Sequence, residues 1–181
     1  MKKFQKLCLI AGVTVLTCGY GNVVNAEAIT TIMQLIDEEG VQEEIGTITI
    51  EDTEYGVLLT PNLSDLPPGI HGFHLHENPS CEPGVDDGEV KAGLAAGGHY
   101  DPKETESHEG PYGEGHLGDL PPLIVDRDGV ASLPILVPRL YPKDFQGRAV
   151  MVHAEGDNFA DEPKSLGGGG GRIACGVVEG N

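Results

Sequence analysis

The stretch GFHLHENPSC, residues 72–81, places two histidines one residue apart, with a glutamate after them and a cysteine close behind. Successive side chains of a β-strand point to opposite faces, so His74 and His76 share one face about 7 Å apart, while Phe73 and Leu75 occupy the other. A single histidine in an apolar strand is usually a packed, hydrogen-bonded residue. Two on the face opposite the apolar one indicate a metal held on the outside of a sheet.

Short alternating segments separated by turn residues surround this strand and predict an all-β domain. The expected strands lie in AITTIMQLI (28–36), IGTITIED (45–52), YGVLLT (55–60), IHGFHLH (70–76), PLIVDRDGVASLPIL (122–136), GRAVMVHA (147–154) and RIACGVVE (172–179). We expect one hairpin around Asp52–Glu54 and a second with its turn at Asp128-Gly129. About eight strands result, and a sandwich or flattened barrel buries such strands most economically.

The first 26 residues predict a secretory signal. Lys2, Lys3 and Lys6 form a basic start, an apolar run follows, and Val24-Asn25-Ala26 fits the small-residue rule for cleavage after Ala26. A membrane anchor is the alternative, but the apolar run is too short to span a bilayer. Residues 27–181 are then one domain, with no internal repeat.

Charge and cysteine content fit an exported domain. Removal of the signal leaves 8 basic and 29 acidic residues, a net charge of −21, and no basic cluster that would favour nucleic acid as a partner. Two cysteines remain, Cys81 and Cys175, and in an oxidising compartment they form one pair. Their disulfide would close a loop of 94 residues, for which chain entropy gives roughly 4–5 kcal/mol of stabilisation.

A long polar segment, residues 77–120, follows the two strand histidines and lacks strand patterning. His99, His108, His116 and Asp119 fall close together in it, and three imidazoles with one carboxylate can complete a tetrahedral Zn²⁺ site. The alternative is a solvated loop in which histidines occur by chance.

The remaining evidence for a second metal comes from a strand near the end of the chain. His153 lies in AVMVHA and makes a nitrogen-rich set with His74 and His76. Imidazole suits copper, zinc, iron and nickel, and tetragonal nitrogen geometry favours Cu²⁺. Composition alone does not choose among these metals.

Five motifs in order along the chain resemble the bacterial, exported copper/zinc superoxide dismutases. They are GFHLHENPSC (72–81), GGHYDP (97–102), GHLGDLPPL (115–123), GRAVMVHAEGDN (147–158) and GGGGGRIACGVVE (167–179). The resemblance covers nearly all of the mature chain with matching spacing. It implies an eight-stranded Greek-key flattened barrel or sandwich with two long functional loops, and dismutation of superoxide to O₂ and H₂O₂.

The resemblance also implies a role for each matching histidine. His74, His76, His99 and His153 would bind copper, and His99, His108, His116 and Asp119 would bind zinc, with His99 shared as a bridge. One copper and one zinc per subunit are therefore the expected cofactors. His71 is left over, and by strand parity we expect it to face inward and hydrogen-bond backbone carbonyls.

Two further residues match positions of the family that support catalysis. Asp157 would link a copper-side and a zinc-side histidine through hydrogen bonds, and Arg172 would dock the superoxide anion; His99 and Arg172 are thus the expected catalytic residues. A solvated aspartate and a surface salt bridge are the alternatives. The glycines at 167–171 would let the backbone pass close to the site. Steering lysines are scarce: Lys91 near the first cysteine and Lys164 in the second loop each lie among acidic residues.

Two rival functions remain at this stage. A periplasmic copper or zinc binding protein without turnover would keep the histidines but would not need Arg172 or the glycine run. A zinc hydrolase needs an open zinc position, which three histidines and Asp119 close. The family and the signal imply a periplasmic enzyme that protects the cell envelope from external superoxide. Family members occur as monomers and as homodimers, and we expect no membrane contact after signal removal.

Overall fold

Eleven strands and three short helical turns make up residues 28–180, the part of the chain that this computed structural model describes. In chain order the elements are β1 (Ile29–Asp37), β2 (Gly40–Thr53), β3 (Gly56–Leu63), β4 (Gly69–His71), β5 (Phe73–His76), β6 (Gly84–Asp86), β7 (Glu89–Lys91), η1 (Leu94–Ala96), β8 (Leu123–Val125), β9 (Ile135–Val137), α1 (Pro142–Phe145), β10 (Arg148–His153), η2 (Leu166–Gly168) and β11 (Arg172–Val178). The predicted signal, residues 1–26, lies outside this part.

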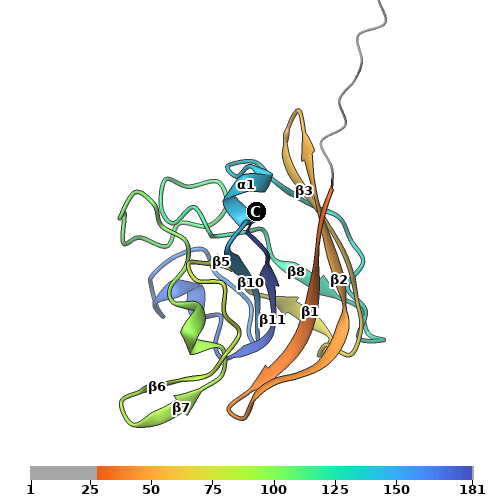
Figure 1. Ribbon diagram of the computed structural model, residues 1–181. Helices are drawn as coiled ribbons and strands as arrows, with labels where there is room; N and C mark the ends of the chain where they lie inside the picture. The colour runs from red at the N-terminus through yellow and green to blue at the C-terminus, as the bar shows by residue number, and fades with distance from the viewer. Residues whose placement is uncertain (1–27, 181) are drawn as a thin grey trace, which may run out of the picture.

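Seven strands form one antiparallel sheet in the order β5-β10-β11-β1-β2-β3-β9. The sheet curls over, so that β1, β2 and β3 form one wall and β5, β10 and β11 another (Figure 1). β4 and β8 pair separately across the remaining opening. The observed architecture confirms the predicted all-β flattened barrel. No helix within residues 28–180 is long and apolar enough to cross a membrane.

The β2–β3 hairpin shows how the alternating pattern builds the core. Ile48, Ile50, Val57 and Leu59 point into the barrel and are fully buried, and Ile50 lies opposite Leu59 in the ladder. In β2 the polar residues Thr47, Thr49 and Glu51 alternate with the isoleucines on the outer face, as a half-buried strand requires. The first predicted hairpin is therefore confirmed.

The strand predicted over residues 70–76 is interrupted at Gly72. The backbone N–H of Gly72 donates to Glu155 O at 2.8 Å, and Gly72 O accepts from the N–H of His153 at 2.8 Å. The chain thus leaves the β4–β8 pair and enters the seven-stranded sheet at this residue. A Cβ at Gly72 would lie 3.3 Å from the ring of His74, so the corner leaves little room for a larger residue.

The predicted hairpin within residues 122–136 is wrong in its pairing. A turn does form, with the N–H of Gly129 donating to Asp126 O, but β8 pairs with β4 and β9 pairs with β3. After the turn, Ala131 bridges to Leu63 of β3. The two arms therefore join different sheets, and both place apolar side chains in the shared core: Leu123, Val125, Ile135 and Val137.

The long segment between β5 and β8 contains more regular structure than its composition predicts. β6 and β7 form a hairpin that projects away from the barrel (Figure 1). Val85 and Val90 face each other across it and are both exposed. The rest of the segment folds back onto the barrel wall, where it covers the histidines of β5.

Candidate metal centre

The β5 histidines sit on a sheet face that the following loop buries. Met151 of β10 lies opposite His74, and His74 and His76 have no exposed surface. The loop adds itself to the free edge of β5, because Leu75 N–H donates to Gly118 O at 2.9 Å and Leu75 O accepts from Tyr100 N–H at 2.8 Å. The outer face of the sheet thus becomes an enclosed site.

Four histidines come together in the first group, which we call cluster A: His74, His76, His99 and His153. Their candidate ligand nitrogens all lie within 4.8 Å of one another. Nε2 of His76 is 3.4 Å from Nε2 of His153, and the rings of His74 and His99 stack with centroids 3.9 Å apart. Such a set of facing nitrogens fits a cation that prefers imidazole.

A second group, cluster B, gathers His99, His108, His116 and Asp119, also with ligand atoms within 4.8 Å of one another. All four are buried. Nδ1 of His99 lies 2.9 Å from Oδ1 of Asp119, and Nδ1 of His108 lies 3.0 Å from its Oδ2. His99 belongs to both clusters, so the two sites share one imidazole.

Asp157 connects the clusters from the side. Its Oδ2 lies 2.7 Å from Nε2 of His74, and its Oδ1 lies 2.8 Å from Nε2 of His108. These bonds use the ring nitrogens of His74 and His108 that face away from the cluster centres. The other nitrogen of each ring is left to point inward.

Buried atoms without partners test whether the residues fit metal ions. Nδ1 of His74, His108 and His116 are all buried without an aligned hydrogen-bond partner, although those of His108 and His116 lie 3.0 and 3.5 Å from carboxylate oxygens of Asp119. Buried polar atoms are almost always paired in proteins, so three orphaned nitrogens aimed into two clusters need an explanation. A cation in each cluster supplies the missing partner, and the donor sets therefore fit copper and zinc.

The ring environments of cluster A favour neutral imidazoles, which are the metal-binding form. Burial and the neighbouring His99 hold the pKa of His74 and His76 well below the ordinary value, and the same causes lower the pKa of His153 to about 4. Burial also lowers the pKa of His99.

Cluster B is electrostatically different because it contains the carboxylate of Asp119 and contacts that of Asp157 through His108. Burial alone would lower the pKa of His108, but its two carboxylate neighbours outweigh this and raise it to about 9. Burial alone would likewise raise the pKa of Asp119 and Asp157, yet hydrogen bonds with His108 and its neighbours hold both below their usual range. This negative character suits a divalent cation.

Arg172 begins β11 beside cluster A and is held by backbone carbonyls. Its Nη1 donates to Gly93 O, and its Nη2 donates to Gly97 O at 2.7 Å. Burial lowers the pKa of its guanidinium from the ordinary value, but arginine stays protonated in proteins. The preceding glycine run passes close to the clusters as expected: a Cβ on Gly167 would overlap the carboxylate of Asp157.

The predicted disulfide is confirmed. Cys81 and Cys175 are bonded, with Cα atoms 5.7 Å apart. The bond ties the loop that carries Gly93 and Gly97 to β11, three residues beyond Arg172. It therefore supports the position of the guanidinium as well as the fold.

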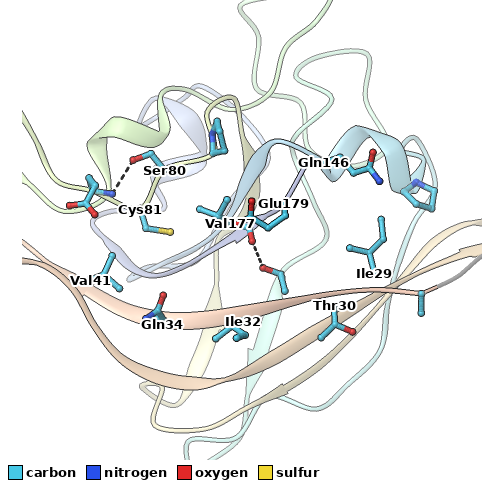
Figure 2. A pocket seen from close by; sticks show the side chains of 15 residues that line it. Ile29, Thr30, Ile32, Gln34, Val41, Ser80, Cys81, Gln146, Val177 and Glu179 are labelled. Atoms are coloured by element: carbon cyan, nitrogen blue, oxygen red, sulfur yellow. Dashed lines mark hydrogen bonds between the residues drawn. The ribbon is translucent and has the colours of Figure 1, made fainter. Parts of the chain in front are cut away.

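A hollow of about 960 Å³ lies elsewhere, between β1 and α1 (Figure 2). Ile29, Ile32 and Gln34 of β1 line one side, and Val177 of β11 and Cys81 lie across from them. None of its lining residues belongs to cluster A or cluster B, so the hollow is separate from the metal centre.

Comparison with known proteins gives the family. The model described as "Copper/zinc superoxide dismutase (SODC)" matches residues 44–178. The chain belongs to the copper/zinc superoxide dismutase family. Superoxide dismutase (Cu-Zn) 2 of Salmonella typhimurium is 51% identical over 176 residues, which cover 97% of this chain and 100% of the relative.

Solved structures agree with this family. The Cu/Zn superoxide dismutase from Brucella abortus has a TM-score of 0.83 and 47% identity, covering 84% of this chain and 100% of that one. The monomeric copper, zinc superoxide dismutase from Salmonella enterica has a TM-score of 0.77 and 51% identity, with the same coverage. As a copper/zinc superoxide dismutase, the protein is an enzyme that dismutates superoxide with copper and zinc as cofactors.

The fold of this superoxide dismutase brings together the six histidines that the sequence predicts as ligands, and it adds supporting residues that the sequence did not predict. His71 lies as expected, with Nδ1 2.7 Å from His153 O and Nε2 2.8 Å from Pro67 O. Asp161 was not predicted: its carboxylate accepts the backbone N–H of His108 at 2.9 Å and so joins the two long loops. Its only signal in the sequence is its position four residues after Asp157.

Proposed function

We propose that cluster A is the copper site and cluster B the zinc site of this enzyme. Copper would be held by His74, His76, His99 and His153, and zinc by His99, His108, His116 and Asp119. The observation that supports the assignment best is the sharing of His99, because six histidines then supply the seven imidazole positions that the two metals need. The orphaned Nδ1 atoms of three of these histidines support it independently.

When bound, copper supplies the one-electron chemistry that oxidises one superoxide and reduces the next, while zinc supplies a redox-silent positive charge. The overall reaction joins two superoxide anions and two protons to give one O₂ and one H₂O₂. The protein must therefore attract an anion, hold it at the copper site and deliver protons.

Arg172 would dock the anion. Two of its five N–H donors are used by the carbonyls of Gly93 and Gly97, which fix the plane of the guanidinium and leave donors for a substrate. Charge-assisted hydrogen bonds from arginine suit a small anion.

His99 would carry a proton. Its Nδ1 is engaged with Asp119 on the cluster B side, so Nε2 is the atom that faces cluster A. We assign to Nε2 the uptake of a proton and its transfer to the peroxide product. Asp157 would keep His74 and His108 oriented, since such hydrogen bonds fix the tautomer and the ring direction of ligands.

Metal analysis together with a dismutase assay tests the site assignment. Fully loaded protein should contain one copper and one zinc per chain, and His116→Ala should lose zinc while keeping copper. A single metal per chain would contradict the assignment. Full loading without dismutase activity would instead favour the alternative, a copper and zinc binding protein without turnover, against which the position of Arg172 argues.

We further propose that the protein is exported to the periplasm and that its signal is cleaved after Ala26. The basic start and apolar run of residues 1–26 support export, and the Cys81–Cys175 disulfide supports an oxidising compartment. In this location the enzyme would protect the cell envelope from external superoxide. Cell fractionation and N-terminal sequencing of the mature protein test both statements; a cytosolic protein beginning at Met1 would contradict them.

One similar structure, from Salmonella enterica, is described as monomeric. Exposed apolar side chains gather on the β4–β8 pair and around a nearby hollow of about 300 Å³: Ile70, Tyr112, Ile124, Leu133 and Leu136. We infer that this is the face that a homodimer of the chain would bury. Sedimentation velocity of the wild type and of Ile124→Lys distinguishes the two states.

A further inference from the structure

The guanidinium of Arg139, between β9 and α1, is directed at one short stretch of the cluster B loop. Its Nε donates to Pro111 O at 3.0 Å and its Nη1 to Gly115 O at 3.2 Å. Its Nη2 donates to Gly110 O at 3.2 Å and also to His116 O. One side chain thus satisfies the carbonyls of four residues, the last of which is a member of cluster B.

The stretch that receives these bonds has no regular structure of its own. Residues 110–116, GPYGEGH, contain no strand or helix, and three of the seven are glycine. Glycine loses more conformational freedom on ordering than other residues do, so this segment is costly to fix. Its carbonyl oxygens are not hydrogen-bonded in a strand or helix. Arg139 supplies the donors that secondary structure would otherwise provide.

The chemistry of this contact requires an arginine. Within residues 28–180 no carboxylate forms an ion pair with Arg139, so its half-buried charge is balanced by carbonyl dipoles alone. A guanidinium presents five donors in a rigid planar fork, whereas a lysine presents three donors from a single point. Lysine keeps the charge but does not span four separated carbonyls.

The opposite side of the same loop is held by the loop that follows β10. Asp161 accepts the N–H of His108 at 2.9 Å, and the Phe159 side chain packs against Gly110, where a Cβ would lie only 2.7 Å from the ring. On the other side, Arg139 donates a hydrogen bond to the carbonyl oxygen of Gly110. His108 and His116 of cluster B therefore lie on a segment that protein contacts hold from two sides.

We propose that Arg139 is a positioning residue for the zinc site: it keeps residues 110–116 ordered so that His116 and His108 are preformed for the metal. This inference rests on the zinc ligands proposed above. Removing the clamp should weaken zinc much more than copper, because three of the four copper ligands are on β5 and β10, away from the clamped stretch.

Two substitutions and one control test the proposal in the full mature protein. Arg139→Gln removes the charge and most donors, and Arg139→Lys keeps the charge but not the fork. Arg127→Gln is the matched control, since Arg127 is exposed. We would measure zinc and copper dissociation constants by chelator competition, the visible spectrum of Co²⁺ bound in place of zinc, and hydrogen exchange of residues 107–118 in metal-free protein.

Partners that orient metal ligands are typically worth about 10- to 100-fold in metal affinity, so we expect the zinc dissociation constant of Arg139→Gln to rise by that factor. The zinc dissociation constant of Arg139→Lys should rise at least fivefold. This variant should also show a weaker tetrahedral Co²⁺ spectrum and faster hydrogen exchange in residues 107–118. Copper affinity of both variants and zinc affinity of Arg127→Gln should change less than twofold.

A rise in the zinc constant of less than fivefold in both Arg139 variants overturns the proposal. So does an equal loss of copper and zinc, because that result reports general destabilisation of the barrel. His116→Ala separates this inference from the proposed function. If His116→Ala loses zinc and Arg139→Gln does not, only the role of Arg139 is wrong; if His116→Ala binds zinc normally, the ligand assignment itself is wrong.

Discussion

Oδ2 of Asp157 lies 2.7 Å from Nε2 of His74, although the two residues are 83 positions apart in the chain. The bond joins a loop residue to a strand residue at the back of cluster A. It leaves Nδ1 of His74 as the only ring nitrogen free to point toward the other cluster A histidines. The other oxygen of Asp157, Oδ1, bonds Nε2 of His108 and leaves Nδ1 of that ring to point into cluster B.

Replacement of Asp157 by asparagine should weaken the binding of both metals. The variant keeps the size of the side chain but loses the negative charge that orients His74 and His108. We expect each metal dissociation constant to rise about 10- to 100-fold. Chelator competition measures this, with the exposed Asp52→Asn as the control of equal charge change. Unchanged affinity for both metals would mean that the ring orientations are fixed by packing alone.

Arg172→Ala should slow dismutation while both metals stay bound. The proposed contact is with the substrate, and a hydrogen bond to a charged group is worth about 1.5–3 kcal/mol, which corresponds to roughly a 10- to 100-fold lower rate. His153→Ala should instead lose copper. Activity per bound copper is the measurement. Loss of copper from the arginine variant would show that its role is structural.

Rising ionic strength should lower the rate, despite the net charge of −21 on the chain without its signal. Charges beyond about 8–10 Å are largely screened at moderate salt, so the positive field of Arg172 and the metals near the copper site dominates. Added salt weakens the attraction of this field for superoxide. Lys91 adds little there, because it is paired with Asp86 on the projecting hairpin. A salt series at fixed pH checks this prediction. Arg172→Ala should flatten the dependence, and a wild-type rate that climbs with salt would show that global repulsion prevails.

Loss of the disulfide should reduce both stability and activity. Cys81→Ser should cost about 2–5 kcal/mol of unfolding free energy. The rate per bound copper should also fall, because the loop that carries Gly93 O and Gly97 O is no longer tied to β11. Denaturant unfolding and a metal-normalised assay measure the two effects. Reduced stability with a normal rate would show that these carbonyls hold Arg172 without help from the bond.

The metal-free protein should lose stability as the pH falls below about 6.5. The pKa of His153 is about 4 in the folded chain and near 6.5 when unfolded, so over this range only the unfolded chain takes up the proton. His74 and His76 behave alike. The three contributions act in the same direction, so the free energy of unfolding falls as the pH falls.

The raised pKa of His108 makes stability fall as the pH rises, which is the opposite direction and a different pH range. Its pKa of about 9 stabilises the folded state below pH 6.5, and that contribution is lost only as the pH rises toward 9. Below pH 6.5, His108 is protonated in both states and therefore does not offset the acid effect. Denaturant midpoints of metal-free protein at pH 7.0 and 5.5 test the prediction, and His153→Gln should reduce the difference. Equal midpoints at the two pH values in the wild type would contradict it.

Local patterns in the sequence determined the strands and the chemistry of the centre. Alternation in IGTITIED places Ile48 and Ile50 in the core, and the same period of two puts His74 and His76 on one face. A period of two is a property of the extended chain itself, so it can be recognised in the sequence without knowing which strands pair. The order of the histidine motifs likewise sufficed to predict the family, which the comparisons confirm, and to predict two sets of metal ligands.

The tertiary structure decided which distant segments meet. The break at Gly72, the crossing of residues 126–131 between barrel edges and the four carbonyls gathered by Arg139 all depend on contacts between residues far apart in the chain. Closing the barrel fixes these pairings, because burial of the shared core favours one arrangement over each local alternative. Arg172 is the clearest case: its place in the sequence suggests an anion contact, but only the fold brings the carbonyls of Gly93 and Gly97 to its guanidinium.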